Sequence, residues 1–197
     1  MLSLTKQNVE VPMQTEKEKM LSGQLYNPSD KELQNDRIQA KNLCQKYNNI
    51  PYDNFKERQN IIKNILNSTG KNITIEPSFY CDYGYNIDIG ENFYSNHNLV
   101  ILDCAKVTIG DNVAIGPNCN IYCALHPLNS EERITWKESA KPVNIGHNVW
   151  LGGNVTILPN VTIGNNSVIG AGSVVTKNIP DNTLAVGNPC KVIRKLS

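Results

Sequence analysis

Three histidines are the only side chains of this chain whose ordinary pKa lies near neutral pH. His126 lies in the segment CALHPLN, where Pro127 restricts the preceding residue to an extended backbone and so holds the imidazole in one direction. His147 lies in a short polar turn, where we expect a solvent-exposed residue. His97 lies in YSNHNLV and could face either solvent or a cleft. His126 is therefore the candidate for acid–base chemistry, and we leave His97 out of the catalytic set.

The spacing of the histidines and cysteines disfavours a metal site. The histidines occupy three unrelated positions without an HxxxxH pair, and no two cysteines form a CxxC motif. We expect the cysteines to be buried free thiols in a reducing cytosol rather than a disulfide framework. The chain is therefore predicted to be cytoplasmic and to need no metal. The cysteines are Cys44, Cys81, Cys104, Cys119, Cys123 and Cys190.

The elements that must position these residues follow a repeat of six. Nine branched aliphatic residues recur in steps of six or a multiple of six, and glycine follows six of them: Ile109, Ile115, Ile121, Ile145, Leu151, Ile157, Ile163, Ile169 and Val175. Neither a helix nor a regular strand has this period, whereas a parallel β-helix is built from such hexapeptides. Pairs such as Asp111-Asn112 suit turns with left-handed backbone. The sequence therefore predicts an all-β solenoid of hexapeptide repeats.

The repeat is interrupted between residues 122 and 144 and then returns in phase. The interrupting segment is polar, contains two prolines and lacks the aliphatic repeat, so we expect a loop at about 123–143 that leaves the solenoid. Long loops of this kind in a compact domain are usually functional or disordered. Because this loop carries His126, we favour the functional interpretation.

Before the solenoid the periodicity is helical. Two segments fit a capping box, in which a hydroxyl and a carboxylate satisfy free N–H groups at a helix start: Thr15-x-x-Glu18 and Ser29-x-x-Glu32. An apolar stripe follows the second box and continues to Tyr47. A third helical stretch, over about 54–67, places one set of apolar residues on a single side: Phe55, Ile61, Ile62, Ile65 and Leu66.

The chain divides into three predicted parts: an arm or disordered segment over 1–14, a helical segment over 15–70, and a parallel β-helix over 71–197. The last residues contain two prolines and three basic residues, and we expect an extended tail that leaves the last coil. The formal net charge of +1 gives no electrostatic basis for binding nucleic acid or a membrane surface. No apolar run could span a bilayer, and the N-terminal residues are too polar for a secretory signal. We expect no nucleic-acid or membrane partner.

Several longer motifs resemble one known family. The segments TEKEKMLSGQLYNPSD, IEPSFYCDYGYNIDIGENFYSNHN, HPLN, KPVNIGHNVWLGGNVTILPNVTIGNNSVIGAGSVVTKNIPDN and GNPCKVIRKL together are similar to the maltose and galactoside O-acetyltransferases. The similarity runs from about Thr15 to the end of the chain. The repeat alone indicates the hexapeptide-repeat acyltransferase superfamily, and the CDYGYNI, HP and NVWLGG blocks point to this subgroup.

The resemblance implies a left-handed parallel β-helix that assembles as a trimer with active sites between subunits. It implies direct transfer of acetyl from acetyl-CoA to a sugar hydroxyl, with His126 as the general base and the N–H of Gly153 as the oxyanion donor. The acceptor site that it implies contains Asp82, Tyr94, Asn96 and Asp103. The coenzyme A site that it implies contains Trp150, Gly153, Ala171, Thr176, Lys177, Lys191 and Arg194.

The residues themselves leave alternatives open. Asp82 could instead cap a turn, and Asp103 could be a residue of a coil corner. The acceptor could be an amine, which would make the chain a hexapeptide N-acetyltransferase acting on an amino sugar or an antibiotic. A non-catalytic solenoid scaffold is the third possibility, and the presence of His126 beside Trp150 and Lys177 argues against it.

Overall fold

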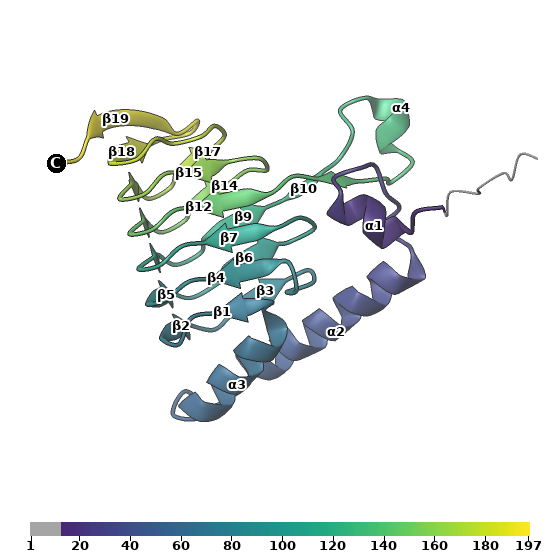
Figure 1. Cartoon of the computed structure of the whole chain (residues 1–197), viewed down its shortest axis with the longest axis horizontal. Helices are drawn as coiled ribbons and strands as arrows, with labels where there is room; N and C mark the ends of the chain where they lie inside the picture. The colour runs from purple at the N-terminus through teal and green to yellow at the C-terminus, as the bar shows by residue number, and fades with distance from the viewer. Residues whose placement is uncertain (1–12) are drawn as a thin grey trace, which may run out of the picture.

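The computed structural model describes residues 13–197, so the arm predicted over residues 1–14 lies almost entirely outside the described residues. The described chain forms a three-sided parallel β-solenoid with helices at its N-terminal end (Figure 1). Its three sides are sheets of five, seven and five strands, in which parallel neighbours belong to neighbouring coils. The predicted fold class, a parallel β-helix of hexapeptide repeats preceded by a helical segment, is confirmed.

Each side of the solenoid is one sheet. Face 1 contains β1 (Ser68–Thr69), β4 (Ile87–Ile89), β7 (Val107–Ile109), β12 (Val143–Ile145) and β15 (Thr162–Ile163). Face 2 contains β2 (Ile73–Ile75), β5 (Phe93–Ser95), β8 (Ala114–Ile115), β13 (Trp150–Leu151), β16 (Val168–Ile169), β18 (Thr183–Val186) and β19 (Lys191–Lys195). Face 3 contains β3 (Phe79–Cys81), β6 (Leu99–Leu102), β9 (Asn120–Tyr122), β14 (Thr156–Ile157) and β17 (Val174–Val175). We call the turns between these faces corners 1/2, 2/3 and 3/1.

The aliphatic residues of the repeat stack inside the solenoid. Ile115 is paired with Leu151, and Leu151 with Ile169, so the same position of successive coils lies in one column. All three side chains are buried. Glycine is required where the corners of successive coils touch: a Cβ on Gly152 would lie 2.6 Å from the backbone nitrogen of Ala171. The six-residue repeat therefore builds both the core and the close approach of the coils.

Corner 1/2 is held by a column of asparagine side chains. Asn112, Asn148 and Asn166 have φ values of 56°, 57° and 56°, as expected for turns with left-handed backbone. The amide of each donates a hydrogen bond of 2.9 Å to the amide oxygen of the next. Beside this column, His147 Nδ1 accepts a hydrogen bond of 3.0 Å from the N–H of Asp111. His147 is thus an exposed turn residue, as predicted.

The helical segment contains α1 (Glu16–Leu21), α2 (Lys31–Asn48) and α3 (Phe55–Ile65). The capping box predicted at Thr15 is confirmed, since both of its reciprocal hydrogen bonds form. The box predicted at Ser29 is wrong, because the carboxylate of Asp30 caps α2 by accepting from the N–H groups of Glu32 and Leu33. Phe55, which we predict on the same side of the third helix as the isoleucines, lines a surface pocket together with Ile62 and is 71% exposed.

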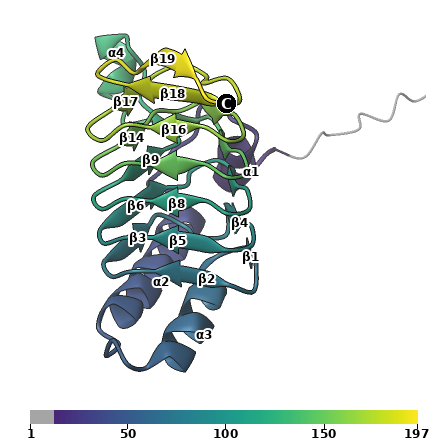
Figure 2. The same ribbon diagram turned by 90° about the vertical axis from the view of Figure 1, so that its left-hand side faces the viewer.

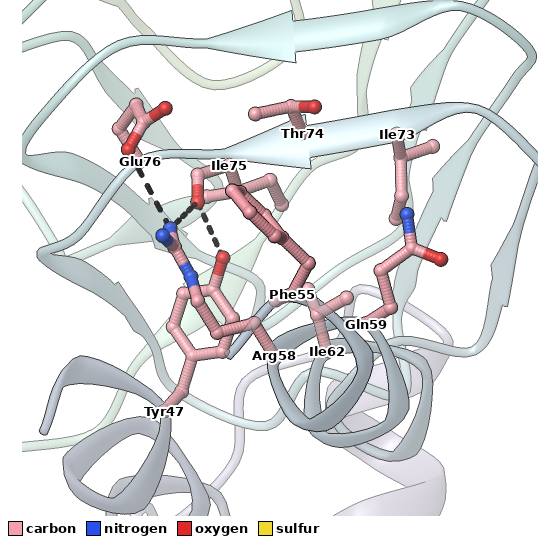
Figure 3. Close-up of a pocket in the computed structure, with 9 residues that line it drawn as sticks. All are labelled: Tyr47, Phe55, Arg58, Gln59, Ile62, Ile73, Thr74, Ile75 and Glu76. Atoms are coloured by element: carbon pink, nitrogen blue, oxygen red, sulfur yellow. Dashed lines mark hydrogen bonds and ion pairs between the residues drawn. The ribbon is translucent and has the colours of Figure 1, made fainter. Parts of the chain in front are cut away.

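Helices α2 and α3 cover the first coil of the solenoid, which would otherwise end in open strand edges (Figure 1). Figure 3 shows the contact at β2, the edge strand of Face 2. Arg58 of α3 is 7% exposed and donates to the carbonyl of Ile75 at 2.9 Å, and its guanidinium lies 3.5 Å from the carboxylate of Glu76. The hydroxyl of Tyr47 donates to the same carbonyl. The edge strand therefore gains partners from helix side chains.

Replacing Arg58 with alanine should lower the free energy of unfolding by about 3 kcal/mol. The substitution breaks the largely buried ion pair with Glu76 and removes the donor that binds the carbonyl of Ile75 on the edge strand. Urea unfolding followed by circular dichroism measures this change. Lys63→Ala removes an exposed cation from the same helix and should change stability by less than about 0.5 kcal/mol. Equal losses in the two variants would contradict the role of Arg58.

Two segments leave the regular coils. Between β9 and β12 an antiparallel ribbon of β10 (Ala124–Leu125) and β11 (Ser139–Ala140) projects outward and carries the short helix α4 (Ser130–Arg133) (Figure 1). The extended tail expected at the C-terminus is wrong. β18 instead joins Face 2, and β19 folds back antiparallel onto it over the last coil (Figure 2). Within residues 13–197 no helix is both long enough and apolar enough to cross a membrane.

Candidate active site

The ribbon places His126 opposite Glu138. Ala124 is paired with Ala140 and Leu125 with Ser139, so the next positions across the ribbon are His126 and Glu138. Nε2 of His126 lies 3.8 Å from Oε1 of Glu138. The imidazole is about half exposed, so a reactant in solution can reach it. This is the arrangement of a proton acceptor with a carboxylate at its side.

Glu138 is itself held in place by Tyr26, in the connection between α1 and α2. The Tyr26 hydroxyl donates to Oε2 of Glu138 at 2.7 Å. The two backbones also pair, with N–H to carbonyl distances of 2.8 and 3.0 Å. Tyr26 is fully buried, and burial raises the pKa of its phenol, which therefore stays protonated as a donor. The helical segment thus fixes one carboxylate oxygen and leaves the other facing His126.

A polar pocket of about 270 Å³ lies beside Glu138. It is lined by side chains from α2 and its preceding loop, from corner 3/1 and from the ribbon: Pro28, Ser29, Arg37, Lys41, Asp82, Tyr83, Cys104 and Glu138. Desolvation raises the pKa of Asp82, whose carboxylate lies 3.6 Å from the thiol sulfur of Cys104. Carboxylates and cations gathered in one small pocket can hold the hydroxyls of a polyhydroxylated ligand. Of the four predicted acceptor residues, Asp82 is the one that lines this pocket.

Asp103 has a different place. It is fully buried, and its carboxylate accepts hydrogen bonds from the N–H groups of Asp82, Tyr83 and Asn86 at 3.0, 2.9 and 3.4 Å. Its oxygens are therefore used within the chain, as in the coil-corner alternative, and they shape the turn that presents Asp82. Desolvation raises the pKa of Asp103 to about 6 despite these donors.

This raised pKa leads to a pH-dependent stability. The folded chain holds the proton of Asp103 more tightly than the unfolded chain, so this group's contribution to the free energy of unfolding is lost as pH rises from about 4 to about 6. Asp103→Asn cannot ionise. The stability of the wild type relative to this variant should therefore fall by about 3 kcal/mol between pH 4 and pH 7, as measured by urea unfolding. A difference that is constant or that grows with pH would contradict this assignment.

The other predicted site residues lie on other parts of the solenoid. Tyr94 is on the outer side of β5 in Face 2, and Asn96 follows it at corner 2/3. Gly153 and Ala171 also lie at corner 2/3, two and three coils further on. Trp150 is on Face 2 and is 57% exposed. One chain therefore does not bring these residues to the pocket beside His126, which lies at corner 3/1.

The basic residues predicted for coenzyme A are exposed at the C-terminal end. Thr176 and Lys177 follow β17 at corner 3/1, on the same edge of the solenoid as His126. Lys191 and Arg194 lie on β19, where both side chains face solvent. Among residues 13–197, the N–H of Gly153 donates no hydrogen bond to another residue. That donor is therefore available to a ligand at corner 2/3.

Sequence reasoning missed several residues of the pocket. Glu138 is twelve residues from His126, and only the pairing of the ribbon shows that they are opposite each other. Arg37 and Lys41 are spaced four apart on α2, which places them on one face of the helix, but this spacing alone does not show that the face borders a pocket. The role of Tyr26 depends on a contact with a residue more than a hundred positions away.

In the described part of the chain, no three His, Cys, Asp or Glu side chains lie together as a metal site would require.

Comparison with known proteins gives matches to both parts of the chain. Residues 19–70 match the maltose acetyltransferase hexapeptide capping motif, and residues 142–177 match the bacterial transferase hexapeptide of six repeats. A putative acetyltransferase of Saccharomyces cerevisiae is 52% identical over 91% of this chain and 92% of its own. The crystal structure of a maltose O-acetyltransferase from Clostridium difficile is 50% identical, with a TM-score of 0.92 over 93% of this chain and 98% of that one. Galactoside acetyltransferase in complex with coenzyme A is 43% identical, with a TM-score of 0.91 over 94% and 92% of the two chains.

Proposed function

Because the chain belongs to the maltose and galactoside O-acetyltransferase family and is an acetyl-CoA-dependent acetyltransferase, we propose that it acetylates a hydroxyl of a sugar with His126 as general base. The observation that carries this proposal is the position of His126. Its imidazole is about half exposed and lies 3.8 Å from the carboxylate of Glu138, which in turn lines the polar pocket. A sugar bound in that pocket would bring a hydroxyl within reach of a base.

The proposed reaction is a direct transfer. His126 accepts the proton of the sugar hydroxyl while the hydroxyl oxygen bonds to the thioester carbonyl carbon. The tetrahedral intermediate then expels the thiolate of coenzyme A, which takes the proton from the imidazolium. Glu138 stabilises the imidazolium while it carries that proton, since a carboxylate beside a cation favours the charged form. The free N–H of Gly153 could donate a hydrogen bond to the negatively charged oxygen of the tetrahedral intermediate. Stabilisation of this charge by preorganised donors is usually the largest single contribution to such catalysis.

We propose that coenzyme A lies along the solenoid, with its reactive end near Gly153 and its phosphates near the C-terminal basic residues. Trp150 offers an exposed ring on Face 2, and Ala171 leaves room at corner 2/3. Lys177, Lys191 and Arg194 supply exposed cations for the phosphates, as Thr176 supplies a hydroxyl. These contacts are offered from two edges of the solenoid, which favours a cofactor bound between two chains.

We propose that the active protein is a homotrimer with each site between two subunits. Two observations support an oligomer. The residues of the site are divided between corner 3/1, which carries His126, and corner 2/3, which carries Asn96 and Gly153. The outward side chains also differ between faces: Face 2 presents Tyr94, Ala114, Trp150, Val168 and Leu184 in register, whereas Face 1 presents Asp88, Thr108, Asn144 and Thr162. An apolar column on one side is typical of a surface that another chain covers.

The proposed acceptor class is tested by an acceptor panel. Sugars, amino sugars and serine are mixed with acetyl-CoA, and release of the coenzyme A thiol is measured for each. We expect acetylation of hydroxyls on maltose, glucose or a galactoside. Exclusive acetylation of amines would favour an N-acetyltransferase, and failure of the protein to bind acetyl-CoA in calorimetry would favour a scaffold. The polar pocket with its paired carboxylate and histidine favours the sugar.

We also propose that the enzyme works in the cytoplasm. All six cysteines are free thiols, and Cys44 and Cys81 remain unbonded although their sulfur atoms lie 3.7 Å apart. Two thiols this close stay reduced, rather than forming a disulfide, mainly in a reducing compartment. Fractionation of cells that express the protein, followed by immunoblotting, tests the location.

A further inference from the structure

A second hollow adjoins the polar pocket beside Glu138. This second hollow has a volume of about 560 Å³ and lies between α2 and the beginning of β3; it is lined by Lys41, Asn42, Gln45, Asn48, Asn49, Ser78 and Tyr80. Lys41 lines both hollows. The two hollows therefore adjoin at Lys41 and follow α2 from Asp82 and Glu138 onward, and we call them together the α2–β3 groove.

The two walls of the α2–β3 groove are regular. On α2 the lining residues lie four apart, in a stripe on one side of the helix: Arg37, Lys41, Gln45 and Asn49. On β3 and its flanks they lie two apart, on the outer side of the strand: Ser78, Tyr80 and Asp82. The helix stripe extends roughly 18 Å, and the strand row extends roughly 13 Å. The groove is therefore longer than a single hexose.

The groove has unused hydrogen-bonding groups. Within residues 13–197, the side chains of Lys41, Gln45 and Tyr80 make no hydrogen bond or ion pair with another residue, and the Tyr80 side chain is half exposed. Asn48 contrasts with them, because its side-chain amide bonds to both the N–H and the carbonyl of Phe79, at 2.8 and 3.0 Å. Asn48 thus holds the helix against the strand and forms a fixed floor, while the others remain available to a ligand.

The chemistry of the groove suits a carbohydrate chain. Amides and hydroxyls can each donate and accept, which matches the hydroxyls of sugar rings. The face of Tyr80 offers an apolar surface with a polar tip, against which the C–H side of a sugar ring can lie. We propose that the α2–β3 groove binds the further units of an oligosaccharide whose terminal unit is acetylated beside His126. This inference rests on the proposed function, and it identifies the acceptor as an oligosaccharide rather than a single sugar.

The test compares acceptors of increasing length. Values of kcat/KM are measured with glucose and with the di-, tri- and tetrasaccharides of the maltose and cellobiose series. We expect kcat/KM to rise roughly tenfold or more between the monosaccharide and the tetrasaccharide in at least one series. In the double variant Gln45→Ala, Tyr80→Ala this gain should be lost, while kcat/KM for glucose stays at the wild-type value.

A matched control and two outcomes make the test decisive. Asn35→Ala removes an amide from the opposite side of α2 and should keep the full gain with length. A value of kcat/KM that is independent of length in both series, or a gain that survives in the double variant, would overturn the inference. If no saccharide of any length is acetylated, the proposed function itself fails. A length-independent rate that still requires His126 leaves the proposed function in place and removes only the groove.

Discussion

Replacing His126 with alanine should lower the rate of acetyl transfer to a sugar by roughly 10²–10⁴, the usual contribution of a general base. The fold should be unaffected, because the imidazole is about half exposed. The measurement is the turnover number from release of the coenzyme A thiol, with circular dichroism and size-exclusion chromatography to confirm the fold and the oligomer. Binding of acetyl-CoA should persist, because the loss lies in the chemical step.

His147→Asn is the matched control for this variant. It also removes an exposed imidazole, but at a turn position that asparagine can fill. In another coil, Asn165 has the same role as His147, since its side-chain oxygen accepts a hydrogen bond of 2.8 Å from the N–H of His147. Its turnover should be close to that of the wild type. Sugar acetylation by His126→Ala at a rate near the wild type would remove His126 from the mechanism and with it the central part of the proposed function.

Mixing two inactive variants should restore activity. His126→Ala damages the side of the site at corner 3/1, and Asn96→Ala damages the side at corner 2/3. In a homotrimer with sites between subunits, a site is intact when His126 comes from one variant and Asn96 from the other. After the two are denatured together in equal amounts and refolded, the mixture should show roughly one quarter of the wild-type turnover.

The same mixture distinguishes a shared site from one within a single chain. If each chain carried a complete site, mixing would restore nothing, because every chain contains one damaged residue. Each variant refolded alone provides the baseline. Full activity of Asn96→Ala alone would show that Asn96 is not part of the site, and the placement of the acceptor at this interface would then be wrong.

The solenoid could be predicted because its signal is local and repeated. A core position, a glycine and an asparagine turn recur together, and each coil can be identified from a few residues. The C-terminal hairpin was missed although GNP between TLAV and KVIRK is a turn flanked by strand-like residues; the prolines and charges favoured an extended tail instead. The start of α2 was misplaced by one residue because Ser29 and Asp30 are both good capping residues, and tertiary contacts choose between them.

The candidate site could be predicted only in part, because some of its residues have local sequence signals and others meet only in the folded chain. His126 is marked by the break in the repeat and by Pro127, which are features of neighbouring residues. Glu138, Tyr26 and Arg37 come from three segments that meet only after the ribbon forms and the helices pack. Phe55 is a second example. Helical periodicity identifies the side of the helix on which Phe55 lies, but it does not show whether the solenoid extends far enough to cover that side chain.

The two ends of the solenoid are closed in different ways, by α2 and α3 at the first coil and by β19 at the last (Figures 1 and 2). An uncovered coil would present the backbone donors and acceptors of a parallel sheet to any other copy of the chain, and identical coils are ideal templates for one another. The caps therefore prevent end-to-end polymerisation of the chain. They limit a repetitive solenoid to a fixed length, and they leave only its lateral faces available for contacts with other chains.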